Sequence, residues 1–109
     1  MTADEFRCMA LGLPEAVEGQ HNGHADFRVG GKVFASLGVP DIRYGTVKLD
    51  RAEQEIVMEA NPGMFSPASG SWGLKGYTRV ELAAADAGAG ALAGAFGLAW
   101  RHLAPKRLL

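Results

Sequence analysis

Two adjacent glycines inside an alternating segment constrain the fold more than any other feature of this sequence. The segment ADFRVGGKVFASLG places apolar residues at nearly every second position on both sides of Gly30 and Gly31. Because strand side chains alternate between two faces, this period of two predicts two strands. Glycine adopts positive φ without steric cost at both positions of a two-residue turn. We therefore expect a tight antiparallel β-hairpin that turns at Gly30-Gly31.

Two capping boxes mark the starts of helices. Thr2 followed by Glu5 predicts a helix from about residue 3 to 11, and Asp50 followed by Glu53 predicts a second helix. In each box a side chain accepts from a backbone amide of the first turn, and the glutamate reaches back. The residues expected on the buried side of the second helix are Ile56, Val57 and Ala60.

The last third of the chain predicts a C-terminal helix capped by Asp86. Its apolar stripe consists of Leu92, Phe96, Ala99, Trp100 and Leu103. The glycines interspersed in this segment each weaken a helix by up to about 1 kcal/mol relative to alanine. Packing of the stripe against a sheet is therefore expected to hold this helix in place.

Two further segments alternate like strands, RYGTVKLD and YTRVEL. The residues expected to face the core are Val47, Leu49, Thr78, Val80 and Leu82. MFSPASGS, between them, is expected to be loop. Strands clustered between terminal helices predict an α+β fold, in which an antiparallel sheet has helices packed on one face. At 109 residues, the chain is expected to form a single domain, 1–109.

Charge and cysteine content limit the function classes. The formal net charge of −1 gives nucleic-acid binding no general electrostatic support. The charge is uneven, however, because residues 1–59 carry a net −4 and residues 60–109 a net +3. No apolar run approaches the ~18 residues of a membrane span, and the N-terminus lacks the pattern of a signal peptide. With Cys8 as the single cysteine, the expected location is the reducing cytoplasm.

The outward side of the last predicted strand carries Tyr77 and Arg79, and Lys75 joins them in a row if the strand begins early enough; Tyr44 points outward from its own strand. Cations contact phosphates, and an aromatic ring stacks on an exposed base. Outward residues of neighbouring strands and the loop tryptophan complete the set of candidate nucleic-acid-binding residues: Lys75, Tyr77, Arg79, Lys48, Arg28 and Trp72. The alternative is an ordinary solvated sheet face, whose Lys and Arg stems cover apolar surface while Trp72 packs down.

Other chemical motifs are weak. GSWGLKG contains glycines and a lysine but lacks the GxxxxGK[ST] spacing, and a strand follows it where a phosphate loop needs a helix. HNGHAD offers His21, His24 and Asp26 to a metal, although the spacing fits no strong signature. Nothing indicates a nucleophile with its base or a pair of acid–base carboxylates. We therefore expect no catalytic site, no cofactor and no resident metal.

The resemblance to a known family is carried by four segments in order: FRVGGKVFASL, TVKLD, SWGLKGYTRVEL and AWRHLAPKRL. In this order and spacing they resemble the MmcQ/YjbR family of small bacterial proteins, over nearly the whole chain. His21-Asn22 is similar to a His-Asn pair of the family. Lys75 with Tyr77 is similar to a Lys-x-Trp segment, with tyrosine here in place of tryptophan. The resemblance implies an α+β, double-wing-like fold and a DNA-binding function, and brings no catalytic residues.

Two functions from different classes therefore remain. The first is a module that binds DNA non-specifically through the hairpin and the Lys75–Arg79 strand. The second is a small protein- or ligand-binding domain whose partner contacts the same face and the loop at 63–76. A continuous positive stripe favours nucleic acid, whereas a mixed surface with an apolar patch favours a protein or small ligand.

Overall fold

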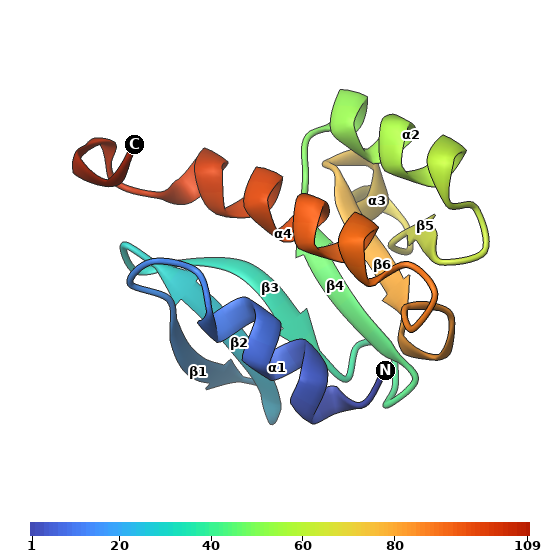
Figure 1. Cartoon of the computed structure of the whole chain (residues 1–109), viewed down its shortest axis with the longest axis horizontal. Helices are drawn as coiled ribbons and strands as arrows, with labels where there is room; N and C mark the ends of the chain where they lie inside the picture. The colour runs from blue at the N-terminus through green and yellow to red at the C-terminus, as the bar shows by residue number, and fades with distance from the viewer.

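The computed structural model describes all 109 residues and contains a six-stranded antiparallel sheet with four α-helices. In chain order the elements are α1 (Ala3–Leu11), β1 (Val17–His21), β2 (His24–Val29), β3 (Lys32–Leu37), β4 (Tyr44–Lys48), α2 (Arg51–Ala60), β5 (Phe65–Pro67), α3 (Ser71–Leu74), β6 (Tyr77–Glu81), the 3₁₀ turn η1 (Leu82–Ala84), α4 (Ala89–Leu103) and the 3₁₀ turn η2 (Lys106–Leu108). The strand order is β1-β2-β3-β4-β6-β5 (Figure 1). This arrangement confirms the predicted α+β class.

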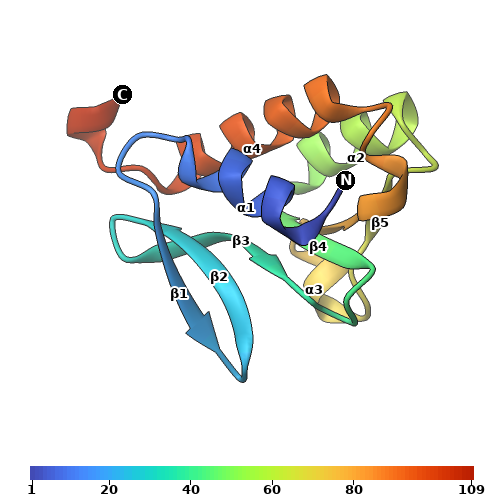
Figure 2. The same ribbon diagram turned by 60° about the horizontal axis from the view of Figure 1, so that its bottom comes forward.

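The helices lie on the two sides of the sheet unequally. In Figure 2, α1, α2 and α4 lie above the sheet, whereas the short α3 and the end of the β1–β2 hairpin extend below it. We call the lower side, opposite α1, α2 and α4, the open face. None of the helices combines the length and the hydropathy needed to span a bilayer.

The core lies between the sheet and the three covering helices and is built around phenylalanine rings. The Phe6 and Phe96 ring centroids are 4.8 Å apart and those of Phe34 and Phe96 are 6.4 Å apart, both in edge-to-face geometry. A Cβ atom at Gly45 would lie 2.5 Å from the Phe6 ring, so glycine allows α1 to pack closely on β4. Phe34 reaches this core because Phe27 pairs with Ala35 and Arg28 with Val33, which leaves Phe34 as the extra residue of a bulge.

The hairpin turn has the predicted conformation, and both capping boxes are present. Gly30 and Gly31 have φ of 58° and 78°. The sheet also has a strand that we did not predict, β1, because the segment VEGQH lacks alternating apolar residues. A signal for it was available: Asn22-Gly23 forms a second tight turn with φ of 50° and 78°, and Asn-Gly is a favoured hairpin turn.

Three local predictions are wrong. In α2 the buried residue is Gln54, and Ile56 is 65% exposed, because α2 turns its polar glutamine toward backbone carbonyls of the segment after β5. Asp86 does not cap α4, which begins after Gly88; the Asp86 carboxylate instead contacts the N-terminal ammonium of Met1 at 2.5 Å. The segment MFSPASGS, expected to be loop, contains the short edge strand β5, which ends at Pro67. Proline is tolerated at this position because an edge strand leaves backbone groups unpaired.

We predict that the two turn glycines differ in their tolerance of side chains. Gly31→Val should destabilise the protein by about 1–2 kcal/mol, the cost of positive φ for an L-residue. No steric cost is added, because nothing lies within 4 Å of the new Cβ atom. Gly30→Val should cost more, because its Cβ would also lie 3.1 Å from the ring of Pro105. Urea denaturation of both variants measures the difference. Equal free energies of unfolding would contradict the contact with Pro105.

Candidate functional site

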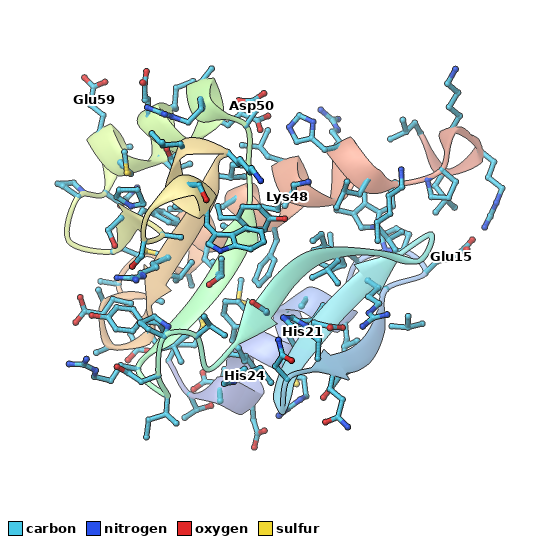
Figure 3. All side chains as sticks on the ribbon, turned by 180° about the vertical axis from the view of Figure 1, so that it is seen from behind. Glu15, His21, His24, Lys48, Asp50 and Glu59 are labelled. Atoms are coloured by element: carbon cyan, nitrogen blue, oxygen red, sulfur yellow. The ribbon has the colours of Figure 1, made fainter.

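Strands β4 and β6 bring rings and cations together on the open face. Their register places Lys48 opposite Tyr77 and Tyr44 opposite Glu81. The Lys48 Nζ atom lies 5.5 Å from the Tyr77 ring centroid, and the Arg79 Cζ atom lies 5.8 Å from that of Tyr44. Figure 3 views this face, with Lys48 over the middle of the sheet and His21 toward the β1–β2 end.

The short helix α3 adds a third ring and another cation. The Trp72 and Tyr77 ring centroids are 5.1 Å apart with the ring planes at 90°, and the Lys75 Nζ atom lies 5.3 Å from the Trp72 ring. Lys75 does not extend strand β6 as expected, because it ends α3 and Gly76 at φ 100° separates it from the strand. It nevertheless reaches the same group of side chains. We call Tyr44, Lys48, Trp72, Lys75, Tyr77 and Arg79 the aromatic–cation cluster.

Close backbone contacts hold α3 against the sheet. A Cβ atom at Gly73 would lie 2.2 Å from the carbonyl oxygen of Ala68, and one at Gly76 would lie 1.9 Å from that of Leu49. Gln54 reinforces the contact, because its Nε2 donates to the carbonyl oxygens of Gly73 and Tyr77, both at 3.1 Å. Gly73 and Gly76 of GSWGLKG therefore allow a close approach of backbones, and the segment forms no phosphate loop.

The cations of the cluster keep their charge available. Neither Lys48 nor Lys75 forms an ion pair, and Arg79 donates to the hydroxyl of Ser69. The neighbouring Arg43 differs, because it binds Asp41 through both guanidinium and backbone N–H groups. The Arg43 hydrogen bonds lower the pKa of Asp41 to about 2, so this pair contributes little net charge to the face.

Arg28, also predicted to bind nucleic acid, lies apart from the cluster. It is on β2, and β3 separates that strand from β4. Its Nε and Nη2 atoms bond the two carboxylate oxygens of the fully buried Asp26 at 2.7 and 2.9 Å, and His21 Nδ1 contacts the same carboxylate at 2.6 Å. The hydrogen bonds from Arg28, and then that from His21, lower the pKa of Asp26. The charge of Arg28 is thus matched within the protein.

His21, His24 and Asp26, which the sequence offered as metal ligands, do not form one cluster in the structure. His21 contacts Asp26, whereas His24 makes no hydrogen bond to either residue. A different trio, Asp50, Glu53 and His102, has potential ligand atoms within 4.8 Å of one another. These groups already have structural roles: Asp50 and Glu53 form the capping box of α2, and His102 Nε2 lies 2.5 Å from Glu53 Oε1. They join the start of α2 to the end of α4, and the absence of a resident metal stays a prediction.

The comparisons with known proteins identify the family. A sequence model of the YjbR family matches residues 11–101. The chain belongs to the YjbR family. A crystal structure of the Deinococcus radiodurans protein DR2400, which has a DUF419 domain, is similar in fold, with a TM-score of 0.70. The two sequences are 19% identical, and the match covers 91% of this YjbR chain and 75% of that one. No curated protein matches the chain.

We predict that Gln54 stabilises this YjbR protein more than Ile56 does, although only Ile56 is apolar. Gln54→Ala should cost about 1–3 kcal/mol, because it leaves carbonyl oxygens next to α3 without their donor. Ile56→Ala, the matched control on the same helix, should change stability by less than about 0.5 kcal/mol. Thermal or urea unfolding compares the two, and the reverse order would contradict the described orientation of α2.

We also predict that Asp26 contributes to stability at neutral pH and less in acid. Because its pKa is lowered in the folded state, the unfolded chain takes up the proton first as the pH falls below about 4. The stabilisation is therefore present above this pH and is lost as the pH falls through the folded-state pKa. Asp26→Asn should be less stable than the parent at pH 7, and the difference should shrink toward pH 2–3.

Urea denaturation of parent and variant between pH 2 and 7 measures this difference. Glu59→Gln is the control, because Glu59 is an exposed carboxylate with no ion pair. A constant difference between parent and Asp26→Asn across this range would show that the carboxylate charge is not what stabilises the cluster.

Proposed function

We propose that this YjbR protein binds nucleic acid non-specifically through the aromatic–cation cluster of the open face. The observation that carries the proposal is that Lys48 and Arg79 on the sheet and Lys75 at the end of α3 lie beside aromatic rings on the open face, without carboxylate partners. The DNA-binding function that the MmcQ/YjbR resemblance implies is consistent with a surface of this composition.

The electrostatics of the cluster supports this proposal despite the overall charge. Phosphate contacts depend on local cations, and each one releases a counterion from the nucleic acid. The formal net charge of −1 does not describe this face, where Lys48, Lys75 and Arg79 outnumber the single acidic residue of β6, Glu81. Binding should therefore be sequence-independent and weak, with a Kd of about 10⁻⁴ to 10⁻⁶ M at physiological salt.

A second candidate function is binding of a protein or small ligand, and the exposed side chains of α3 favour it. Leu74 is 67% exposed and Trp72 is 57% exposed, so apolar surface lies beside the cations. Glu81 adds a negative charge at the other end of β6. A partner of this kind would need an apolar surface with acidic residues, and it would contact the same face.

We further propose that the chain is one cytoplasmic binding domain, 1–109, and that it catalyses no reaction. One hydrophobic cluster joins the helices to the sheet, which supports a single domain. The single cysteine, Cys8, is exposed and free, which agrees with a reducing compartment.

We predict that Lys75→Ala combined with Arg79→Ala weakens binding to all sequences alike. Each lost phosphate contact lowers the slope of log Kd against log salt by about one unit, so the double variant should lose about two. Fluorescence anisotropy with labelled duplex and single-stranded DNA over a salt series measures this slope.

The matched control is Arg101→Ala, because Arg101 is exposed on α4, on the opposite side of the sheet, and forms no ion pair. It should leave the salt slope unchanged. Circular dichroism confirms that the variants fold. Unchanged binding by the folded double variant, or no binding by the parent at low salt, would show that the open face is not a nucleic-acid site.

A further inference from the structure

We infer that the open face prefers single-stranded to duplex nucleic acid and that Trp72, Tyr77 and Tyr44 stack on unpaired bases; this inference rests on the proposed function. The structural observation behind it is that the rings lie on the uncovered side of the sheet, on α3, β6 and β4. Cations alone would serve a duplex equally well, whereas stacking needs a base whose face is free.

The ring geometry offers two separate stacking surfaces at one end of the cluster. Trp72 and Tyr77 are perpendicular, with centroids 5.1 Å apart, so they cannot stack on the same base. More than half of Trp72 is exposed, and its contact with Tyr77 fixes its position without burying it. An exposed tryptophan that already packs against a neighbouring ring is a suitable stacking platform, because this contact restricts its side chain before a base binds.

The strand register places the third ring at a distance that suits a short single strand. Since Tyr77 is opposite Lys48 and Tyr44 is opposite Glu81, Tyr77 and Tyr44 are separated by four residues along the strands. This separation corresponds to about 13 Å at the ~3.3 Å rise of a strand. Arg79 lies between them, with its Cζ atom 5.8 Å from the Tyr44 ring. A nucleic acid running along β6 therefore meets ring, cation and ring in succession.

The two lysines flank this path and complete the site. In the free protein the Lys48 and Lys75 ammonium groups lie over the Tyr77 and Trp72 rings, at 5.5 and 5.3 Å from the centroids. Such contacts are weak at exposed positions, and the long side chains can exchange a ring for a phosphate. The resulting footprint is about four nucleotides, the lower end of the range for a single oligonucleotide-binding module.

The test uses tryptophan fluorescence, because the chain has an exposed and a buried tryptophan. Trp72 is on the open face, whereas Trp100 is buried and donates its Nε1 hydrogen to the Pro14 carbonyl at 2.9 Å. The protein is titrated at low salt with (dT)₄, (dT)₈, (rU)₈ and a 16-base-pair duplex. We expect the single strands to quench the fluorescence and bind more tightly than the duplex. Trp72→Phe should keep the binding and lose most of the quenching.

Matched pairs of variants separate stacking from charge. Tyr77→Ala and Tyr44→Ala should each weaken single-strand binding about tenfold and leave duplex binding nearly unchanged, whereas Tyr77→Phe and Tyr44→Phe should bind like the parent. Because the phenylalanine variants retain the ring, they also control for folding. Stacking on either (dT)₈ or (rU)₈ supports the inference, and the tighter of the two identifies the preferred sugar.

The outcomes distinguish the inference from the function on which it rests. Equal affinity for duplex and single strand, or equal binding by the alanine and phenylalanine variants, would overturn the inference. The proposed function would survive that result if Lys75→Ala with Arg79→Ala still lowered the salt slope. No binding to any of the four nucleic acids at low salt would overturn both, and a protein or small ligand would then be the expected partner.

Discussion

The backbone contact between Leu49 and Gly76 determines where the candidate site lies. Leu49 leaves β4 toward α2 and Gly76 enters β6, and the Leu49 amide donates to the Gly76 carbonyl at 3.2 Å. Any side chain at position 76 would collide with Leu49, so only glycine allows this approach. Gln54 then binds the carbonyls on either side of the junction. As a result, α3 lies against the open face, and Trp72 meets Tyr77.

Because α1, α2 and α4 all lie on the other side of the sheet, the short α3 is the one helix that occupies the open face. On the side that faces α1 and α4, the sheet contributes Phe27, Phe34 and Val47 to the hydrophobic core, so this side serves stability. The opposite side of β4 and β6 holds polar and aromatic residues that the fold does not need to bury. Substitutions among them are therefore expected to change binding without changing the fold, and this makes the site testable.

Much of the fold could be predicted because local signals and tertiary structure agree. The Gly30-Gly31 turn, the capping boxes and the alternation of β4 and β6 each depend on near neighbours in the sequence. The failures have tertiary causes. Gln54 is buried because carbonyls of a distant segment accept its hydrogen bonds, and β1 pairs with β2 although its sequence has no alternating apolar residues. Within the site, alternation placed Tyr77 and Arg79 correctly, whereas the contact of Trp72 with Tyr77 depends on α3, which no sequence pattern indicated.

Charge compensation decides which basic residues can act on a partner. Arg28 and Arg43 are each held by an aspartate, and the lowered pKa values of Asp26 and Asp41 mean that both carboxylates stay ionised at neutral pH. A phosphate would have to compete with these partners for either guanidinium. The lysines of the aromatic–cation cluster form no ion pair and lie over ring faces, and a ring is a weaker competitor than a carboxylate. A polyanion at the proposed site would therefore meet positive charge that is local to α3, β4 and β6, and salt screening limits the influence of the distant acidic residues.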